Sequence, residues 1–204
     1  MTVIKICGIT NLADALAAVE AGADALGFNF YRPSPRYISP SDARKIIDQL
    51  PESILKVGVF VNEGLHSAQQ ITVEAALSAV QLHGDESPEY CRELAGMFVI
   101  KAFGAGDNLQ VETYDVDAIM LDTKDDVLHG GTGRTFDWSI AQRTSQSVPK
   151  LFLAGGLSPE NVAKAIATVR PYAVDACSSL EERLGKKSHE RMRLFVEAVR
   201  SVAP

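Results

Sequence analysis

Cysteine is scarce in this sequence of 204 residues, which has it at positions 7, 91 and 177 alone. Thiols this few and this far apart do not make a disulfide framework, and no Cys-x-x-Cys or Cys/His cluster predicts a metal site. No apolar run approaches the roughly 18 residues of a membrane-spanning helix. The first ten residues lack the apolar segment of a signal peptide. We therefore expect a cytoplasmic protein with no membrane partner and no metal.

Positive charge is also limited, because 20 Lys and Arg residues face 26 Asp and Glu residues and leave a net charge of −6. Nucleic acids and anionic membranes are bound through basic patches, so we expect neither as a partner. An anionic small molecule would have to be held by local backbone geometry. The composition is 46% hydrophobic and 23% charged, as in ordinary globular domains. No linker or low-complexity segment divides residues 1–204, and we expect a single domain.

Short, continuously apolar segments recur along the chain, and they are typical of parallel strands that are covered on both faces. We predict strands at Val3–Cys7, Asp24–Phe28, Lys56–Val61, Ala79–His83, Phe98–Ala102, Ala118–Asp122, Lys150–Ala154 and Tyr172–Cys177.

Helical patterns lie between these strands and begin with Asn or Ser residues, some followed by Pro, as helix first turns do. We predict helices at Asn11–Ala21, Ser41–Gln49, Ser87–Ala95, Ser158–Thr168 and Ser188–Ser201. Strands that alternate with helices at this spacing predict an α/β fold, a single (β/α)8 TIM barrel. An open doubly wound sheet is the alternative. The absence of a Gly-x-Gly-x-x-Gly motif after the first strand favours the barrel.

Polar side chains gather at the carboxyl ends of the predicted strands, where barrels of this kind have their active sites. Cys7 and Asp122 each end a strand and are candidates for a thiolate base or nucleophile and for an acid. A small buried thiol and a carboxylate that caps a turn are the ordinary alternatives. Arg36, in a Pro-rich loop, and His83 are candidates for ligand contacts. A solvated arginine and a structural histidine are the alternatives there.

Glycine and serine follow the last two strands, at Gly155, Gly156, Ser178 and Ser179. The loops after strands seven and eight commonly bind phosphate in this fold. Glycine lets the backbone approach the anion, and the helix predicted from Ser158 would aim its first N–H groups at it. We therefore expect a phosphorylated small molecule as the ligand.

A long loop follows the sixth strand and contains Gly131, Thr132 and Gly133. It is either a solvent loop or a lid that excludes water when a ligand binds.

Seven sequence blocks occur in order along nearly the whole chain: Lys5–Thr10, Gly27–Phe28 with Ser34–Tyr37, Val57–Asn62, Gln81–Glu86, Leu121–Thr123, Gly130–Gly133 with Phe136–Trp138, and Leu153–Leu157. Together they resemble the phosphoribosylanthranilate isomerase family. The resemblance implies a (β/α)8 barrel that rearranges N-(5-phosphoribosyl)anthranilate to 1-(2-carboxyphenylamino)-1-deoxyribulose 5-phosphate in tryptophan biosynthesis, without a metal or an organic cofactor.

The resemblance also implies roles for individual residues. Asp122 would be the acid that opens the furanose ring, and Cys7 the base that removes the C2 proton. Arg36 would bind the anthranilate carboxylate. The other expected substrate contacts are His83, Gly131, Thr132, Gly133, Gly155, Gly156, Ser178 and Ser179.

The segment after the eighth strand departs from the family run Asp-Val-Ser-Ser-Gly-Val-Glu. This chain has Asp175-Ala176-Cys177-Ser178-Ser179-Leu180-Glu181, so that a serine is replaced by Cys177 and a glycine by Ser179. If the replaced glycine has a positive φ, we expect strain of about 1 kcal/mol or more at Ser179, or a rearranged loop.

Two other functions stay open on the sequence. The related sugar-phosphate isomerases of histidine biosynthesis have an aspartate where the first strand here ends in Cys7. A barrel that binds a phosphorylated ligand with weak or lost turnover is favoured only by the departures after the eighth strand, and the presence of both Cys7 and Asp122 counts against it.

Cys7 and Cys177 end strands that are neighbours in a closed barrel, about 4.8 Å apart. A disulfide between them is within reach if both side chains lie on the same face. Side chains on opposite faces, or a reducing cytoplasm, would prevent it.

Overall fold

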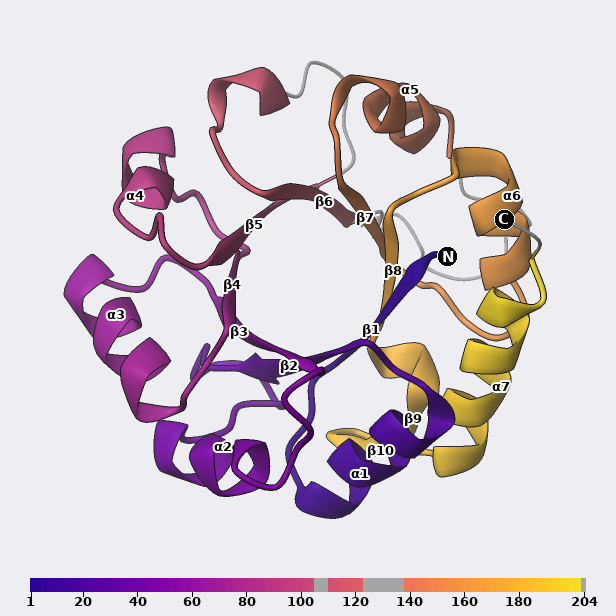
Figure 1. Cartoon of the computed structure of the whole chain (residues 1–204), viewed down its shortest axis with the longest axis horizontal. Coiled ribbons are helices and arrows are strands. Elements are labelled where there is room, and N and C mark those ends of the chain that lie inside the picture. Colours follow the sequence, from indigo (N-terminus) through magenta and orange to yellow (C-terminus); the bar gives the residue numbers. More distant parts are fainter. Residues whose placement is uncertain (105–109, 123–137, 203–204) are drawn as a thin grey trace.

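The computed structural model describes residues 1–104, 110–122 and 138–202. Eight parallel strands close into a barrel in chain order, with β8 paired back to β1, and Figure 1 looks along this barrel with helices around its outside. The predicted fold is confirmed. The strands are β1 (Val3–Cys7), β2 (Ala25–Asn29), β3 (Leu55–Phe60), β4 (Ala79–Leu82), β5 (Phe98–Gly104), β6 (Ala118–Asp122), β7 (Leu151–Ala154) and β8 (Ala173–Ala176).

The α-helices of the described residues are α1 (Leu12–Ala21), α2 (Pro40–Ile47), α3 (Leu65–Glu74), α4 (Pro88–Arg92), α5 (Ser139–Ser147), α6 (Val162–Val169) and α7 (His189–Arg200). Short 3₁₀ turns form at η1 (Val111–Thr113) and η2 (Ser178–Leu180). None of these helices combines the length and the apolarity that crossing a bilayer requires.

Four of the five helices predicted from the sequence begin with a capping side chain, and the fifth, α6, does not. Asn11, Ser39, Ser87 and Ser188 each accept a backbone N–H of the first turn, in α1, α2, α4 and α7, which satisfies one donor that the helix leaves unpaired. The sequence analysis did not predict α3 or α5. Neither helix has a side-chain cap, and each buries only alanine and threonine, so neither shows a clear apolar face in the sequence. The predicted start of α6 was also too early, because Ser158–Asn161 forms a turn and the helix starts at Val162.

Alternating strand residues divide the core into two buried layers. Outward residues such as Ile4 and Ile6 of β1 pack against the helices. Inward residues such as Ala118 and Met120 of β6 fill the barrel. This period of two also makes Asp122 an inward residue of β6 and Cys7 an inward residue of β1.

A small hairpin, β9 (Glu181–Arg183) and β10 (Lys186–Lys187), follows β8. It lies beside α1 in Figure 1. The Asp14 carboxylate at the start of α1 accepts the Lys187 backbone N–H at 2.8 Å, and the Thr10 hydroxyl donates to the Gly185 carbonyl at 2.7 Å. The hairpin is therefore fixed against the β1–α1 loop, and no motif in the sequence predicted it.

A buried ion pair orders the segment after β4. Lys101 Nζ lies 2.9 Å from Glu86 Oε2 and donates to the Gly84 carbonyl at 2.6 Å. Glu86 also accepts the backbone N–H groups of Asn62 and Gly84. Because each charge is enclosed and hydrogen-bonded, the loss of either partner would leave the other charge buried and uncompensated.

We predict that Lys101→Met lowers the free energy of unfolding by about 3–5 kcal/mol, since it strands the Glu86 carboxylate in the interior. Lys45→Met is the matched control, because its ion pair with Asp42 lies in solvent, with a side chain 74% exposed against 2% for Lys101. Lys45→Met should leave stability nearly unchanged. Urea denaturation followed by circular dichroism measures both, and equal losses in the two variants would contradict the prediction.

Candidate active site

A cavity of about 400 Å³ opens at the carboxyl ends of the strands. Among the residues that line it are these predicted site residues: Cys7, Arg36, His83, Asp122, Gly155, Gly156, Ser178 and Ser179. The structure thus brings them to one place. Gly131, Thr132 and Gly133, which were also predicted, lie outside the described residues.

Two glycines make room for Cys7 and its neighbours. A Cβ on Gly27, the β2 partner of Cys7, would come within 2.6 Å of Cys7 Sγ. Gly8 has a φ of +77°, and a Cβ there would come within 2.8 Å of Arg36 Cδ and 3.0 Å of Cys177 Sγ. Both positions therefore exclude a side chain, and Arg36 and Cys177 both pack over the backbone that follows β1.

Cys7 and Cys177 lie on the same face of the sheet. Lys5 pairs with Asp175 across β1 and β8, and Ile6 with Ala176, so one further step places Cys7 level with Cys177. Both cysteines are free, and Cys177 raises the pKa of Cys7 while Cys7 lowers the pKa of Cys177. The two side chains therefore share the inner face of the barrel, next to each other and without a covalent bond.

An ion pair lies beneath the thiols inside the barrel. Lys5 Nζ is 2.9 Å from Asp175 Oδ1, and Lys5 is fully buried. Burial acts to lower the pKa of Lys5, but the Asp175 carboxylate and Cys7 raise it by more. Lys5 therefore stays charged below Cys7.

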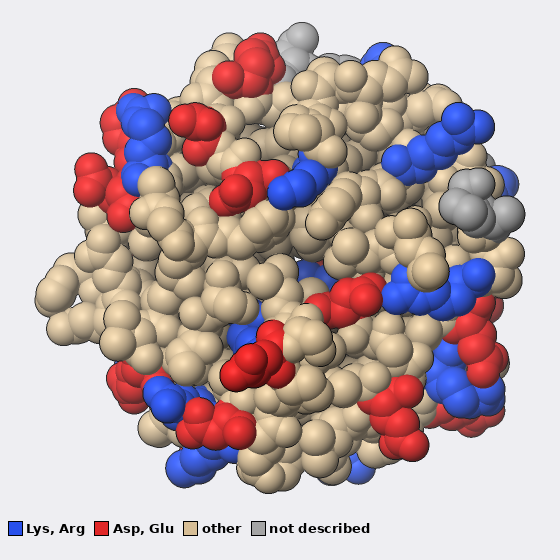
Figure 2. Space-filling view, in the orientation of Figure 1, with Lys and Arg blue, Asp and Glu red and all other residues tan. Residues whose placement is uncertain are grey.

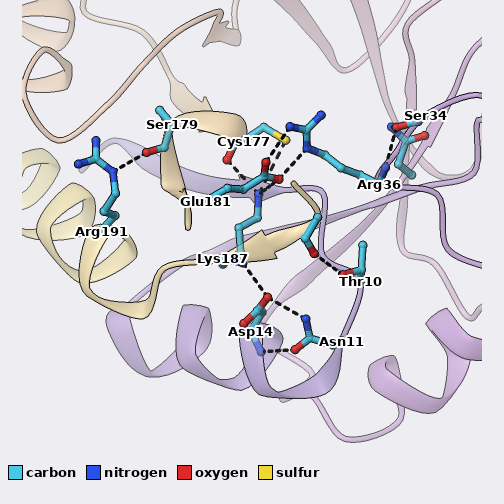
Figure 3. A network of polar contacts seen from close by, with 12 residues as sticks. Thr10, Asn11, Asp14, Ser34, Arg36, Cys177, Ser179, Glu181, Lys187 and Arg191 are labelled. Atoms are coloured by element: carbon cyan, nitrogen blue, oxygen red, sulfur yellow. Dashed lines mark hydrogen bonds and ion pairs between the residues drawn. The ribbon is translucent and has the colours of Figure 1, made fainter. Parts of the chain in front are cut away.

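Arg36 is bound by a carboxylate that the sequence interpretation did not single out. Its Nε and Nη2 donate to the two oxygens of Glu181 at 2.6 and 2.7 Å, a bidentate pair drawn in Figure 3. Lys187 Nζ lies 3.3 Å from the same carboxylate and donates to the Cys177 carbonyl at 2.9 Å. Burial acts to raise the pKa of Glu181, but Arg36 and Lys187 hold it below its usual range. Glu181 thus positions both cations.

Asp122 faces a histidine and a glutamine across the cavity from Cys7. His83 Nε2 lies 3.4 Å from Asp122 Oδ2, and His83 Nδ1 lies 2.8 Å from Gln81 Nε2. Gln81 is buried, and its Oε1 has no hydrogen-bond partner in the described part of the chain. An unpaired buried acceptor beside a cavity suits a donor on a ligand.

The loops after β7 and β8 form the remaining wall. Gly155 and Gly156 have φ values of +89° and +64°, conformations that glycine adopts without strain. Contrary to the prediction, the first N–H groups of a helix at Ser158 are not there, because α6 begins at Val162. In the described part of the chain, this wall is therefore formed by the glycine turn and by Ser178 rather than by a helix N-terminus.

Ser179 is not strained, so of the two alternatives expected for this position, strain or a rearranged loop, strain does not occur. It lies in η2 and is absent from the described non-glycine residues with positive φ, which are Asn62, Ala76 and Arg170. Its hydroxyl donates to the Leu157 carbonyl, and its own carbonyl accepts from Arg191 Nε at 2.6 Å. Ser179 therefore connects the loop after β8 to the loop after β7.

Charged side chains of both signs are intermingled on the face that Figure 2 shows. Within the described residues, no group of three or more His, Cys, Asp and Glu side chains is placed to hold a metal ion. The chemistry available at this site is thus that of thiols, carboxylates, an imidazole, a guanidinium and backbone N–H groups.

Comparison with known proteins relates this site to a family. Residues 4–198 match the family model described as N-(5'-phosphoribosyl)anthranilate (PRA) isomerase. The chain is 48% identical over 201 residues to the enzyme of that name from Thermotoga maritima, covering 97% of this chain and 98% of the relative. It is 46% identical over 199 residues to the one from Trichlorobacter lovleyi, covering 96% and 97%.

Solved structures agree with this match. The crystal structure of phosphoribosyl anthranilate isomerase from Thermotoga maritima superimposes with a TM-score of 0.89 at 46% identity, over 98% of this chain and 99% of the other. A structure of the isomerase in complex with reduced 1-(o-carboxyphenylamino)-1-deoxyribulose 5-phosphate has a TM-score of 0.87 at 44% identity, with the same coverage. By sequence and by structure, this chain belongs to the N-(5'-phosphoribosyl)anthranilate isomerase family.

Proposed function

We propose that the cavity isomerises N-(5'-phosphoribosyl)anthranilate to 1-(2-carboxyphenylamino)-1-deoxyribulose 5-phosphate by general acid–base catalysis, with Asp122 as the acid and Cys7 as the base. The observation that carries the proposal is that these two groups enter one cavity from well-separated strands. Around the ring of strands, β8 and β7 lie between β1 and β6. An acid and a base placed this way can act on different atoms of one substrate.

The reaction requires one proton to be given and another to be taken. Protonation of the furanose oxygen by Asp122 opens the ring and leaves an iminium at C1. Cys7 then removes the proton on C2, and the resulting enolamine becomes the ketone when C1 gains a proton and the C2 hydroxyl loses one. His83, which is 3.4 Å from Asp122, orients the carboxyl group for its step.

Arg36 is assigned to the anthranilate carboxylate. Glu181 occupies the edge of the guanidinium formed by Nε and Nη2, so the edge formed by Nη1 and Nη2 is left for the substrate. Planar two-point binding of a carboxylate is the geometry that guanidinium favours.

The phosphate is assigned to the wall formed by Gly155, Gly156 and Ser178. This wall supplies donors from the backbone and from a hydroxyl without net positive charge, which suits a chain whose net charge is −6 and a dianionic group.

Each residue that we assign comes from one chain, and residues 1–204 act here as a single catalytic domain. A solved Thermotoga maritima relative is described as dimeric.

We predict that Cys7→Ser and Asp122→Asn each lower kcat by at least about a hundredfold, because general acid–base groups contribute about 10²–10⁴-fold. Steady-state turnover of freshly made substrate is the measurement. Cys91→Ala, which removes a buried thiol outside the cavity, and Asp115→Asn, on the exposed surface, are the controls and should keep normal turnover. Near-normal kcat in either site variant, with an unchanged circular dichroism spectrum, would remove that residue from the mechanism.

We predict that Arg36→Ala raises KM by about 10- to 100-fold, the factor expected when hydrogen bonds to a charged group are lost. The increase in KM would come from the lost contact between Arg36 and the anthranilate carboxylate. A substrate analogue without that carboxylate should therefore lose much less kcat/KM in the variant. Equal losses for the two substrates would show that Arg36 acts on something else, such as the position of Glu181.

A further inference from the structure

We propose that Cys7 and Cys177 share one proton in the resting enzyme, that the negative charge rests on Cys177 beside Lys187, and that Cys177 accepts the Cys7 proton when Cys7 acts as the base. Cys177 would then be a positioning residue that works through Cys7. This inference rests on the proposed function and names a group that activates its base.

The first support is the contact between the thiols. Both cysteines line the cavity, and the register of β1 with β8 brings them side by side on its inner face. This placement lets one thiol share its proton with the other. A shared proton is held strongly when one of the two sulfurs is an anion, so the placement favours a pair that carries one proton.

The second support is a buried ammonium group that needs an anion. Lys187 is 1% exposed. Its Nζ lies 3.8 Å from Cys177 Sγ and 3.3 Å from Glu181 Oε1, as Figure 3 shows. Glu181 is already bound at both oxygens by Arg36. A lysine enclosed in this way is stable when a further negative charge lies nearby, and Cys177 can supply it.

The charges that face the two thiols leave room for one thiolate. Lys5 from β1, Arg36 from the β2–α2 loop and Lys187 from β10 supply three positive charges. Glu181 from β9 supplies one negative charge, and Asp175 from β8 supplies at most one more, because burial raises the pKa of Asp175 to about 7 although Lys5 acts to lower it. The three cations therefore exceed the carboxylates by at least one charge, and a thiolate on the pair compensates it.

The position of the charge within the pair follows from its neighbours. The hydrogen bond with Cys7 lowers the pKa of Cys177 to about 6, and Lys187 and Arg36 act in the same direction against burial. The same hydrogen bond, together with burial, raises the pKa of Cys7, and Lys5 only partly offsets this. Cys7 is thus the donor and Cys177 the acceptor in the resting state.

The proton balance of the step is simple. The Cys7 thiol passes its proton to the Cys177 thiolate, and the Cys7 thiolate then takes the proton from C2 of the substrate. The pair ends the step with two protons, while Asp122 has given one proton to the ring oxygen. The next cycle begins once the pair has lost one proton and Asp122 has regained one through solvent.

The resting charge is tested without substrate, by the ultraviolet absorbance of thiolate as the pH rises from about 5 to about 9. The wild-type protein and Cys91→Ala should show one thiolate that forms at about pH 6. Cys177→Ser should lack this step. Cys7→Ser should keep a step at low pH, because the serine hydroxyl still donates to the Cys177 thiolate and because Lys187 and Arg36 remain beside it. The low step persisting unchanged in Cys177→Ser, or vanishing in Cys7→Ser, would place the charge on Cys7 and overturn the proposal.

The relay is tested by the pH dependence of kcat/KM. As the pH falls, the pair gains its second proton and the base is lost, so activity falls on the acid side. In Cys177→Ser the base is an isolated buried thiol. The pH at which kcat/KM falls on the acid side should therefore rise by about one pH unit or more. No rise in that pH, even with lowered thermal stability, would show a purely structural role and overturn the relay.

The two tests separate this inference from the proposed function. If Cys7→Ser keeps normal turnover, the assignment of Cys7 as the base fails, whatever the titration shows. If Cys7→Ser loses turnover while Cys177→Ser titrates and turns over like the wild type, Cys7 remains the base and the shared proton is wrong.

Discussion

The register between β1 and β8 is the constraint on which the rest of the site depends. It closes the barrel, and it sets Lys5 beside Asp175 at one level and Cys7 beside Cys177 at the next. Because the side-chain period of a strand is two, a shift of either strand by one residue would turn its two side chains from the interior toward the helices. The buried Lys5–Asp175 pair opposes such a shift, since neither charge could be left unpaired in the apolar outer layer. The position of Cys7, the base that we propose, therefore depends on barrel closure as well as on the local sequence.

The polar side chains of the site are held in place before a ligand binds. Polar groups in and around the cavity are held by other side chains. Arg36 is held by Glu181, and Lys187 by Glu181 and the Cys177 carbonyl, from distant or later segments, whereas His83 is held by Gln81 of the same strand end. These bonds fix side chains before any ligand arrives, and such preorganisation lets charged groups act without rearrangement. The segment after β4 is ordered in the same way by Lys101 and Glu86.

Much of this arrangement could be predicted from the sequence, and the part that could not has identifiable physical causes. Apolar segments at even spacing predicted the strands to within about two residues at most ends, and capped helices were found because a cap is a local signal. Helices α3 and α5 lack that signal. Ser158 was predicted as the start of α6. Pro159 allows a turn there as well as a helix, and the turn is stabilised by Asn161, whose Oδ1 accepts the Ser158 backbone N–H.

Among the site residues, Cys7, Arg36, His83 and Asp122 were recognised because they end strands or belong to motifs. Glu181 and Lys187 were not recognised, because a charged residue after the last barrel strand usually lies in solvent. Asp175 was not recognised, because its partner Lys5 lies beside it only once β8 pairs with β1.

The sequence by itself determined the barrel, the end of it that carries the polar residues, and the inward direction of Cys7 and Asp122, because strand periodicity and parallel topology are local and repetitive properties. Only the tertiary structure decided which charges meet. Cys7 and Cys177 are 170 positions apart in the chain, and Arg36 and Glu181 are separated by 145. Whether such groups touch depends on closure of the ring and on the path of the β9–β10 hairpin, and neither is encoded in the residues that meet.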